Sequence, residues 1–123
     1  QPWLEVAAAL TRRYSDLRQV FGGRSAGARV ACRTAATGDA IAVICLAYPV
    51  HLPGKPESAP SRLAELNAVQ VPVLVVQGDR DAFGMPARRR GRTLVVATGA
   101  DHSLKKGLDD VHRSVARFLR QVS

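Results

Sequence analysis

The residues that point most clearly to chemistry stand in a row, Gly23-Arg24-Ser25-Ala26-Gly27. They match the pattern G-x-S-x-G and lie between a short apolar run and an alanine-rich segment typical of a helix. A turn this tight leaves no room for side chains beside the serine, and it lifts the serine hydroxyl above the sheet. The pattern therefore predicts that Ser25 is a nucleophile that attacks a substrate carbonyl. The alternative is a glycine-rich turn whose backbone N–H groups hold an anion.

A serine nucleophile needs partners, because its hydroxyl is a poor nucleophile at neutral pH unless a base takes the proton. His102 can take that proton and later give it to the leaving group. A buried carboxylate must orient the imidazole, and we choose Asp81 because it lies well past the end of an apolar run. Asp79 is the alternative. Asp101 is adjacent to His102, so it is a poor orienting group and is interpreted as a loop residue.

The elements that must position these residues follow from the apolar patterns. Helices are expected over Trp3–Tyr14, Ala26–Thr37, Ser61–Val69 and a final stripe of Leu108, Val111, Val115, Phe118 and Val122. Strands are expected over Leu17–Phe21, Ala40–Ala47, Val71–Gln77 and Thr93–Ala97. Gly38 is expected to end the second helix in the left-handed C′ position. The sequence therefore predicts an α/β fold, a mainly parallel sheet of about four strands flanked by helices on both faces.

This fold would bring the three candidates to one edge of the sheet. Ser25 follows the first expected strand, Asp81 the third and His102 the fourth. The carboxyl ends of parallel strands share an edge, which is where ligands bind in such sheets. The chain order Ser, Asp, His is also the order of the triad on this kind of sheet. Each residue alone has an ordinary structural explanation, and their joint placement favours a catalytic triad.

Several segments beyond the triad carry a family resemblance. They are Gly22–Ala31, Cys45–Pro49 with His51, Pro53-Gly54-Lys55-Pro56, Val76-Gln77-Gly78 with Asp81 and Phe83-Gly84, and Gly99 with Asp101-His102-Ser103. Together they resemble the testis-expressed-protein-30/KANSL3-like branch of the α/β-hydrolases, which is related to the dienelactone hydrolases. The resemblance implies a serine hydrolase with Ser25 as nucleophile, Asp81 as acid and His102 as base. It also implies that Tyr48–Pro56 shapes the substrate pocket.

The pocket is expected to include Arg24, Tyr48, His51 and Phe83. The substrate expected of such a site is a small ester, thioester or lactone. The backbone N–H of Ala26, directly after the nucleophile, is expected to contribute to the oxyanion hole. No metal or organic cofactor is expected, because the three histidines are spread out and no Cys/His pair has ligand spacing.

The chain departs from this family at its N-terminal side, where the family has further strands before the serine turn. We therefore expect residues 1–123 to form a single, N-terminally truncated hydrolase domain. The second oxyanion-hole donor would belong to the missing part. Leu17–Phe21, central in the complete fold, would become an open apolar edge that favours a homo-oligomer. A non-catalytic interaction module or an inactive fragment is thus the alternative to an enzyme.

Composition limits the remaining function classes. With 46% hydrophobic residues, the chain should fold as a globular domain, and no apolar run approaches the ~20 residues of a membrane span. Cys32 and Cys45 lie in apolar surroundings and are expected to be buried, reduced thiols, which suits a cytoplasmic location. The net charge of +8 raises nucleic acid as a partner. Only 5% of residues are aromatic, so we interpret Arg88–Arg92 as a solvated basic surface and expect no nucleic-acid partner.

Overall fold

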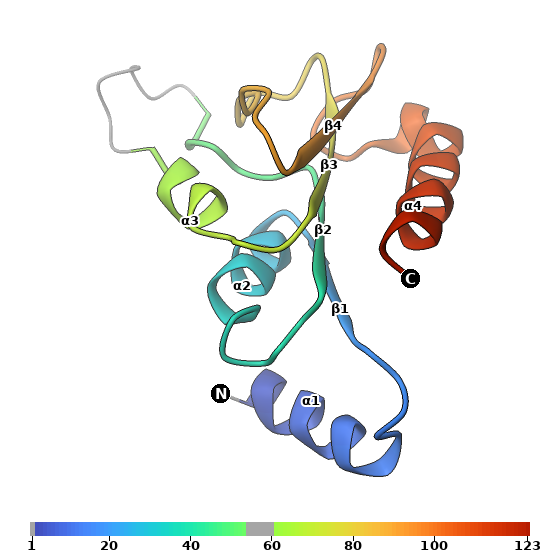
Figure 1. The fold of residues 1–123 in the computed structure, drawn as a ribbon. Coiled ribbons are helices and arrows are strands. Elements are labelled where there is room, and N and C mark those ends of the chain that lie inside the picture. The colour runs from blue at the N-terminus through green and yellow to red at the C-terminus, as the bar shows by residue number, and fades with distance from the viewer. Residues whose placement is uncertain (1, 54–60) are drawn as a thin grey trace.

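The computed structural model describes residues 2–53 and 61–123, in which helices and strands alternate up to the third strand, and the fourth strand follows it directly (Figure 1). The helices are α1 (Pro2–Arg13), α2 (Ala26–Thr34), α3 (Leu63–Asn67) and α4 (Leu108–Val122), with a short 3-10 turn, η1 (Lys105–Gly107), before the last. The strands are β1 (Val20–Arg24), β2 (Ala42–Leu46), β3 (Val73–Gly78) and β4 (Arg92–Ala97). The predicted order of elements and the α/β fold class are confirmed.

The four strands form one parallel sheet in the order β1-β2-β3-β4. Every pair of neighbours in this order is also consecutive along the chain, so each connection returns the chain to the start of the next strand. The carboxyl ends of all four strands therefore lie at one edge of the sheet, the upper edge in Figure 1. The loops that leave this edge carry the candidate site residues.

Helices cover both faces of the sheet, with α2 and α3 on one side and α4 on the other (Figure 1). Side chains of one strand alternate between the two layers. In β2, Val43 and Cys45 pack toward α2, whereas Ala42 and Ile44 pack toward α4. Strands buried on both faces read as continuous apolar runs, which is why β2 and β3 could be recognised in the sequence.

The first strand lies further along the chain than predicted. Leu17–Phe21 was expected, but β1 spans Val20–Arg24, and Leu17 is 62% exposed. Pairing with β2 decides the bounds, because Val20 stands opposite Ala42 and the ladder continues to Arg24. Gly22 and Gly23 weaken a strand signal in the sequence, yet the ladder runs through both of them up to the serine turn.

The prediction for Gly38 was also wrong. Helix α2 ends at Thr34, and the left-handed residue of the following turn is Asp39, with φ 56°. Gly38 is required by packing instead, since a Cβ there would lie 2.4 Å from the ring of Phe21. The other predicted bounds coincide with the observed ones or lie within two residues of them.

Strand β1 ends the sheet and pairs with β2 alone among the strands of the described residues. Helix α1 lies below this end of the sheet in Figure 1, where the ring of Trp3 meets Phe21 edge to face at 5.3 Å. Within residues 2–53 and 61–123, no helix combines the length and apolar character that crossing a membrane requires.

Candidate active site

Ser25 occupies a strained turn between β1 and α2. Its backbone has φ 55° and ψ −119°, a conformation that residues other than glycine rarely adopt. The Ser25 N–H donates to the carbonyl of Leu46 at 2.9 Å, and the Ser25 carbonyl accepts from the N–H of Ala28 at 3.0 Å. The strand ladder thus holds one side of the turn and the first turn of α2 holds the other. Strain held in this way is common where a side chain must be presented for chemistry.

A chain of hydrogen bonds links the three residues predicted to form a triad. Ser25 Oγ lies 2.8 Å from Nε2 of His102, and Nδ1 of His102 lies 2.9 Å from Oδ2 of Asp81. The Asp81 side chain is fully buried, whereas the His102 side chain is 21% exposed. With the ring proton on Nδ1 facing the carboxylate, Nε2 has a free lone pair for the serine hydroxyl. The arrangement can take a proton from Ser25 and stabilise the resulting imidazolium.

The loop after β3 fixes both the acid and the base. The second carboxylate oxygen of Asp81, Oδ1, accepts the N–H of Phe83 at 2.7 Å. The Phe83 ring stacks on the His102 imidazole, with centroids 3.9 Å apart and planes 24° apart. Phe83 was predicted as a pocket residue, and the structure places it directly against His102. Its position limits how the imidazole can turn.

The other acidic candidates bond elsewhere. Asp79 Oδ1 accepts the N–H of Gly99 at 2.8 Å, which connects the loops after β3 and β4. Asp101 accepts from both the N–H and the hydroxyl of Ser103, and these hydrogen bonds lower the pKa of its carboxyl. Asp101 therefore stabilises its own loop, while the carboxylate beside His102 is that of Asp81.

Gln77 supports the site, although the sequence analysis named it only within a family segment and gave it no role. Its side chain is fully buried near the end of β3. Its Oε1 accepts the N–H of Tyr48 at 2.8 Å, and its Nε2 donates to the carbonyls of Tyr48 at 2.7 Å and Gly84 at 2.8 Å. One amide thus ties the loop after β2 to the loop that carries Asp81. The available signal was a polar residue inside an otherwise apolar strand.

The remaining predicted pocket residues occupy different environments. Tyr48 is fully buried, donates its hydroxyl to the Arg62 carbonyl at 2.6 Å, and has its pKa raised by burial. It can therefore shape a pocket by supporting the loop rather than by facing solvent. The backbone N–H of His51 donates to the Phe83 carbonyl at 3.0 Å. Arg24 is exposed at the end of β1.

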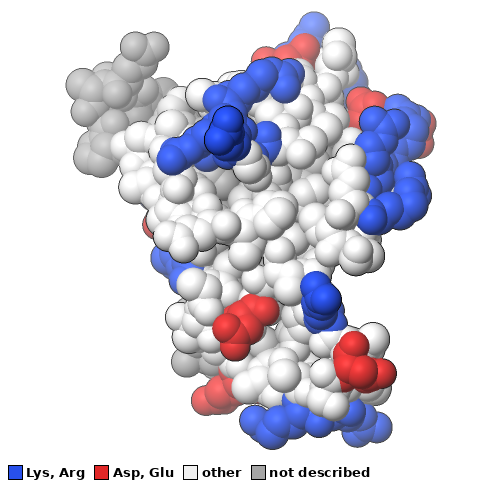
Figure 2. All heavy atoms as spheres, in the orientation of Figure 1, with Lys and Arg blue, Asp and Glu red and all other residues white. Residues whose placement is uncertain are grey.

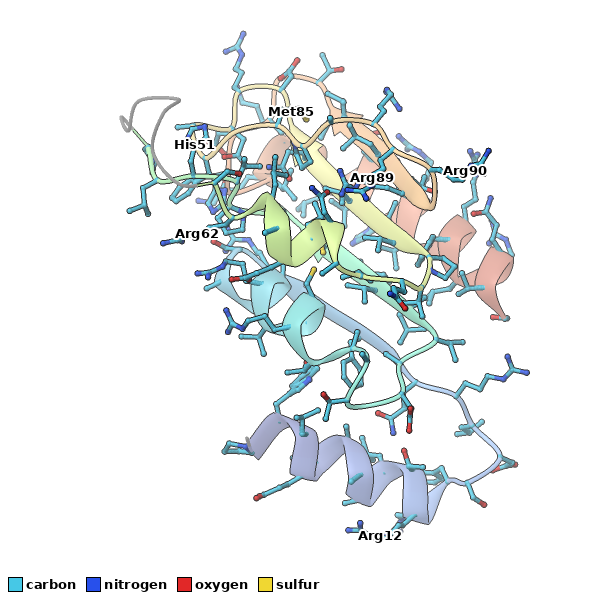
Figure 3. All side chains as sticks on the ribbon, turned by 60° about the vertical axis from the view of Figure 1, so that its left-hand side comes forward. Arg12, His51, Arg62, Met85, Arg89 and Arg90 are labelled. Carbon is cyan, nitrogen blue, oxygen red and sulfur yellow. The ribbon has the colours of Figure 1, made fainter. Side chains whose placement is uncertain are left out.

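Figure 3 shows His51 and Met85 at the same end of the molecule, in the loops that follow β2 and β3. The ring of His51 lies close to Gly84, where a Cβ would stand 2.9 Å from Nε2. The Gly54–Pro56 part of the segment predicted to shape the pocket lies outside the described residues.

Ser25 and His102 are partly exposed, whereas the Asp81 side chain behind them is buried. Four cavities of about 200 to 450 Å³ occur among the described residues, and each is lined by residues outside the triad. Ala26, the predicted oxyanion donor, is the exposed first residue of α2. N–H groups of a first helical turn have no acceptor within the helix and favour negative charge. In the same described part of the chain, no three His, Cys, Asp or Glu side chains gather as a metal site would require.

Basic side chains are spread over several parts of the surface, with acidic ones among them (Figure 2). Within the run predicted to be a solvated basic surface, Arg88 donates to the carbonyl of Leu94 at 3.3 Å. Arg92 donates to the carbonyl of Ala87 at 2.8 Å and to Oδ1 of Asn67 at 2.6 Å. These two guanidinium groups connect their loop to β4 and α3. The absence of a nucleic-acid partner stays a prediction.

Comparisons of this chain with known proteins identify its fold and family. None of the curated proteins matches this chain. Among solved structures, an alpha-beta serine hydrolase homologue from Coxiella burnetii is 25% identical with a TM-score of 0.68, over 94% of this chain and 55% of that one. An α/β serine hydrolase without lid from Xanthomonas campestris is 25% identical with a TM-score of 0.71, over 94% and 53%. This chain therefore spans about half the length of these structures.

A third structure shares the fold. It is a putative hydrolase of the alpha/beta superfamily from Xanthomonas campestris pv. campestris, 23% identical with a TM-score of 0.73, over 98% of this chain and 66% of that one. The family model described as "Alpha/beta hydrolase domain" matches residues 1–118, nearly the full length of this sequence. The chain belongs to the alpha/beta hydrolase domain family.

Proposed function

We propose that this chain carries the catalytic triad of a serine hydrolase that cleaves a small ester, thioester or lactone through an acyl-enzyme on Ser25. The observation that carries the proposal is the continuous hydrogen-bond chain from Ser25 Oγ through His102 to the buried Asp81. Serine hydrolases among the structural neighbours support the same reaction class.

In the first half of the reaction, Ser25 Oγ attacks the substrate carbonyl carbon while His102 Nε2 takes the hydroxyl proton. The C–O bond to serine forms, and the carbonyl oxygen becomes an oxyanion. Asp81 stabilises the imidazolium by accepting its Nδ1–H. The N–H of Ala26, directly after the nucleophile, would donate to the oxyanion. The tetrahedral intermediate then collapses, and His102 returns the proton to the leaving alcohol or thiol.

In the second half, a water molecule takes the place of the leaving group. His102 accepts a proton from this water, whose oxygen attacks the acyl carbon. Collapse of the second tetrahedral intermediate breaks the bond to Ser25, and the serine recovers its proton from His102. An acid is released, and the enzyme returns to its starting state.

This chain spans about half the length of its structural neighbours, so we propose that a complete active site includes residues beyond it. A complete oxyanion hole has a second donor, and loss of one donor typically costs ~10²–10³ in rate. We therefore expect this chain alone to be acylated more slowly than a full-length neighbour. Membership of the testis-expressed-protein-30/KANSL3-like branch and a cytoplasmic location stay predictions.

An acyl-enzyme can be detected directly. We would incubate the chain with p-nitrophenyl acetate, stop the reaction in acid, and measure intact mass and peptide masses. The proposal predicts one acetyl group on Ser25, with none on that peptide in the Ser25→Ala variant. Acetylation confined to lysines, at the same level in both proteins, would contradict it.

A second candidate function is association with another copy through the open edge of β1. Next to that edge, Leu10, Tyr14 and Leu17 line a cavity of about 200 Å³, and all three are exposed. The edge also offers unpaired backbone groups for another strand. A second copy presents the same edge and the same apolar cavity, so a two-fold pairing would bury both.

Sedimentation velocity tests this association. The wild-type chain should sediment as a dimer, and Leu17→Lys should shift it to the monomer. Leu108→Lys serves as the matched control, because Leu108 is 54% exposed at the start of α4, away from β1. A monomeric wild type, or equal loss of association in both variants, would rule out pairing through this edge.

A further inference from the structure

Two cysteines that the proposed reaction does not use lie in contact beneath the serine turn. Cys32 is in α2 and Cys45 is in β2, and their Sγ atoms are 3.6 Å apart. Both thiols are free. A disulfide has a sulfur–sulfur bond of about 2 Å, so the two sulfurs must come about 1.5 Å closer to form one.

The two sulfurs differ in their access to solvent. Cys45 has no exposed surface, whereas Cys32 is 8% exposed and lines a cavity of about 450 Å³. Ala36, Asp39 and Val69 form part of the wall of the same cavity. A small oxidant that enters this cavity reaches Cys32, whereas Cys45 is not among the residues that line it.

The two thiols also differ in acidity: the more exposed Cys32 is the more acidic of the two. The hydrogen bond between the two thiols lowers the pKa of Cys32. The same hydrogen bond, together with burial, raises the pKa of Cys45. The thiolate is the reactive form of cysteine, and Cys32 is the cysteine on the cavity wall, so we assign Cys32 as the attacking sulfur and Cys45 as the resolving one.

We propose that Cys32 and Cys45 are a redox-active pair that closes to an intramolecular disulfide when a hydroperoxide enters the cavity. The Cys32 thiolate attacks one peroxide oxygen, the O–O bond breaks, and Cys32 becomes a sulfenic acid. The Cys45 sulfur then attacks the Cys32 sulfur, and the sulfenic oxygen leaves as water. With hydrogen peroxide, two thiols are oxidised to one disulfide and the peroxide is reduced to two waters.

The position of the pair connects this reaction to Ser25. Cys45 stands opposite Gly23 in the strand ladder, and its neighbour Leu46 accepts the Ser25 N–H. Helix α2, which carries Cys32, begins directly after Ser25. Closing the pair from 3.6 Å to a bond shortens the sulfur–sulfur distance by about 1.5 Å and cross-links α2 to β2 beside the serine turn. A misplacement of about 1 Å can lower a rate by ~10², so the disulfide should slow acylation of Ser25.

The first experiment tests the disulfide itself. The chain would be treated with hydrogen peroxide, blocked with N-ethylmaleimide in denaturant, and digested without reductant. The expected product is a Cys32–Cys45 linked peptide, lighter by two hydrogens, that dithiothreitol separates. Sulfinic acid on Cys32 with Cys45 still alkylated, a disulfide between two chains, or two unreacted thiols would each overturn the proposal. This measurement does not depend on the activity of Ser25.

The second experiment tests the connection to Ser25, and this part rests on the proposed function. The rate of fluorophosphonate labelling would be compared in the reduced, oxidised and re-reduced chain. Oxidation should lower the rate about tenfold or more, and dithiothreitol should restore it. In Cys45→Ala, which cannot form the linkage, peroxide should not produce a reversible loss. An unchanged labelling rate in a chain shown to contain the disulfide would contradict the claim that the disulfide slows acylation of Ser25. An equal reversible loss of labelling rate in Cys45→Ala would contradict it as well.

Discussion

Gly23 and Gly27 meet so closely across the serine turn that a Cβ on Gly23 would lie 2.3 Å from the carbonyl oxygen of Gly27. Backbone surrounds the Gly23 position, so no side-chain movement can relieve the overlap. The Cβ position of Gly27 itself is open, with no atom within 4 Å. The two glycines of the G-x-S-x-G pattern are therefore not equivalent in this chain.

Gly23→Ala should destabilise the chain by about 2 kcal/mol or more, because the turn must open to admit a methyl group. Gly27→Ala should be neutral or stabilising by up to about 1 kcal/mol, because alanine suits a helical position better than glycine. Urea unfolding of both variants measures the difference. Equal destabilisation by the two substitutions would contradict the geometry of the turn.

Asp81→Asn should lower the rate of fluorophosphonate labelling by about 10³–10⁴, because an amide no longer holds the proton on Nδ1 of His102. Asp79→Asn is the matched control, since the asparagine oxygen can still accept the N–H of Gly99. Its labelling rate should equal that of the wild type. A larger loss in Asp79→Asn than in Asp81→Asn would move the role of the acid to Asp79.

Gln77→Leu should destabilise the chain by about 3 kcal/mol or more. The substitution leaves the N–H and carbonyl of Tyr48 and the carbonyl of Gly84 without their buried partner. Gln121→Leu, at an exposed position of α4, provides the control and should change little. Thermal unfolding compares the two variants. A Gln77→Leu chain as stable as the wild type would mean that the buried amide is not needed to hold the two loops.

The ion pair between Arg29 and Glu65, with Nη2 and Oε1 2.6 Å apart, connects α2 to α3. The hydrogen bond from Arg29 lowers the pKa of the Glu65 carboxyl from its ordinary value of 4.5. A lowered folded-state pKa adds stability above the ordinary value, and this stability is lost as the pH falls through the folded-state pKa.

Glu65→Gln should therefore be less stable than the wild type at pH 7, by up to about 1 kcal/mol because the pair is partly exposed. The difference should shrink as the pH falls below the ordinary carboxyl value. Urea unfolding across this acidic range measures it, with Glu5→Gln on the exposed face of α1 as control. A difference that grows toward acidic pH would have the wrong sign for this ion pair.

The general architecture could be predicted because the sheet is buried on both faces. Continuous apolar runs marked β2 and β3, and the spacing of Leu108 to Val122 marked α4. Because the strands were predicted to be parallel, Ser25, Asp81 and His102 were expected at the same edge of the sheet. The structure brings them within hydrogen-bond distance there. Topology, rather than any local motif, made this prediction strong.

The features that were predicted wrongly or not predicted depend on contacts between distant segments. The bounds of β1 are set by its ladder with β2, which passes through two glycines that read locally as a break. Gly38 is required by the ring of Phe21, a residue of another element. The role of Gln77 comes from backbone groups in two loops. No pattern within a single segment contains this information.

The most direct test of the account is labelling of the chain with a fluorophosphonate, followed by mass spectrometry of its peptides. A working triad predicts one phosphonyl adduct on Ser25, no adduct in Ser25→Ala, and strongly reduced labelling in an alanine variant of His102. A folded chain with no adduct on Ser25, or labelling that persists in Ser25→Ala, would contradict the claim that Ser25, His102 and Asp81 form a working triad.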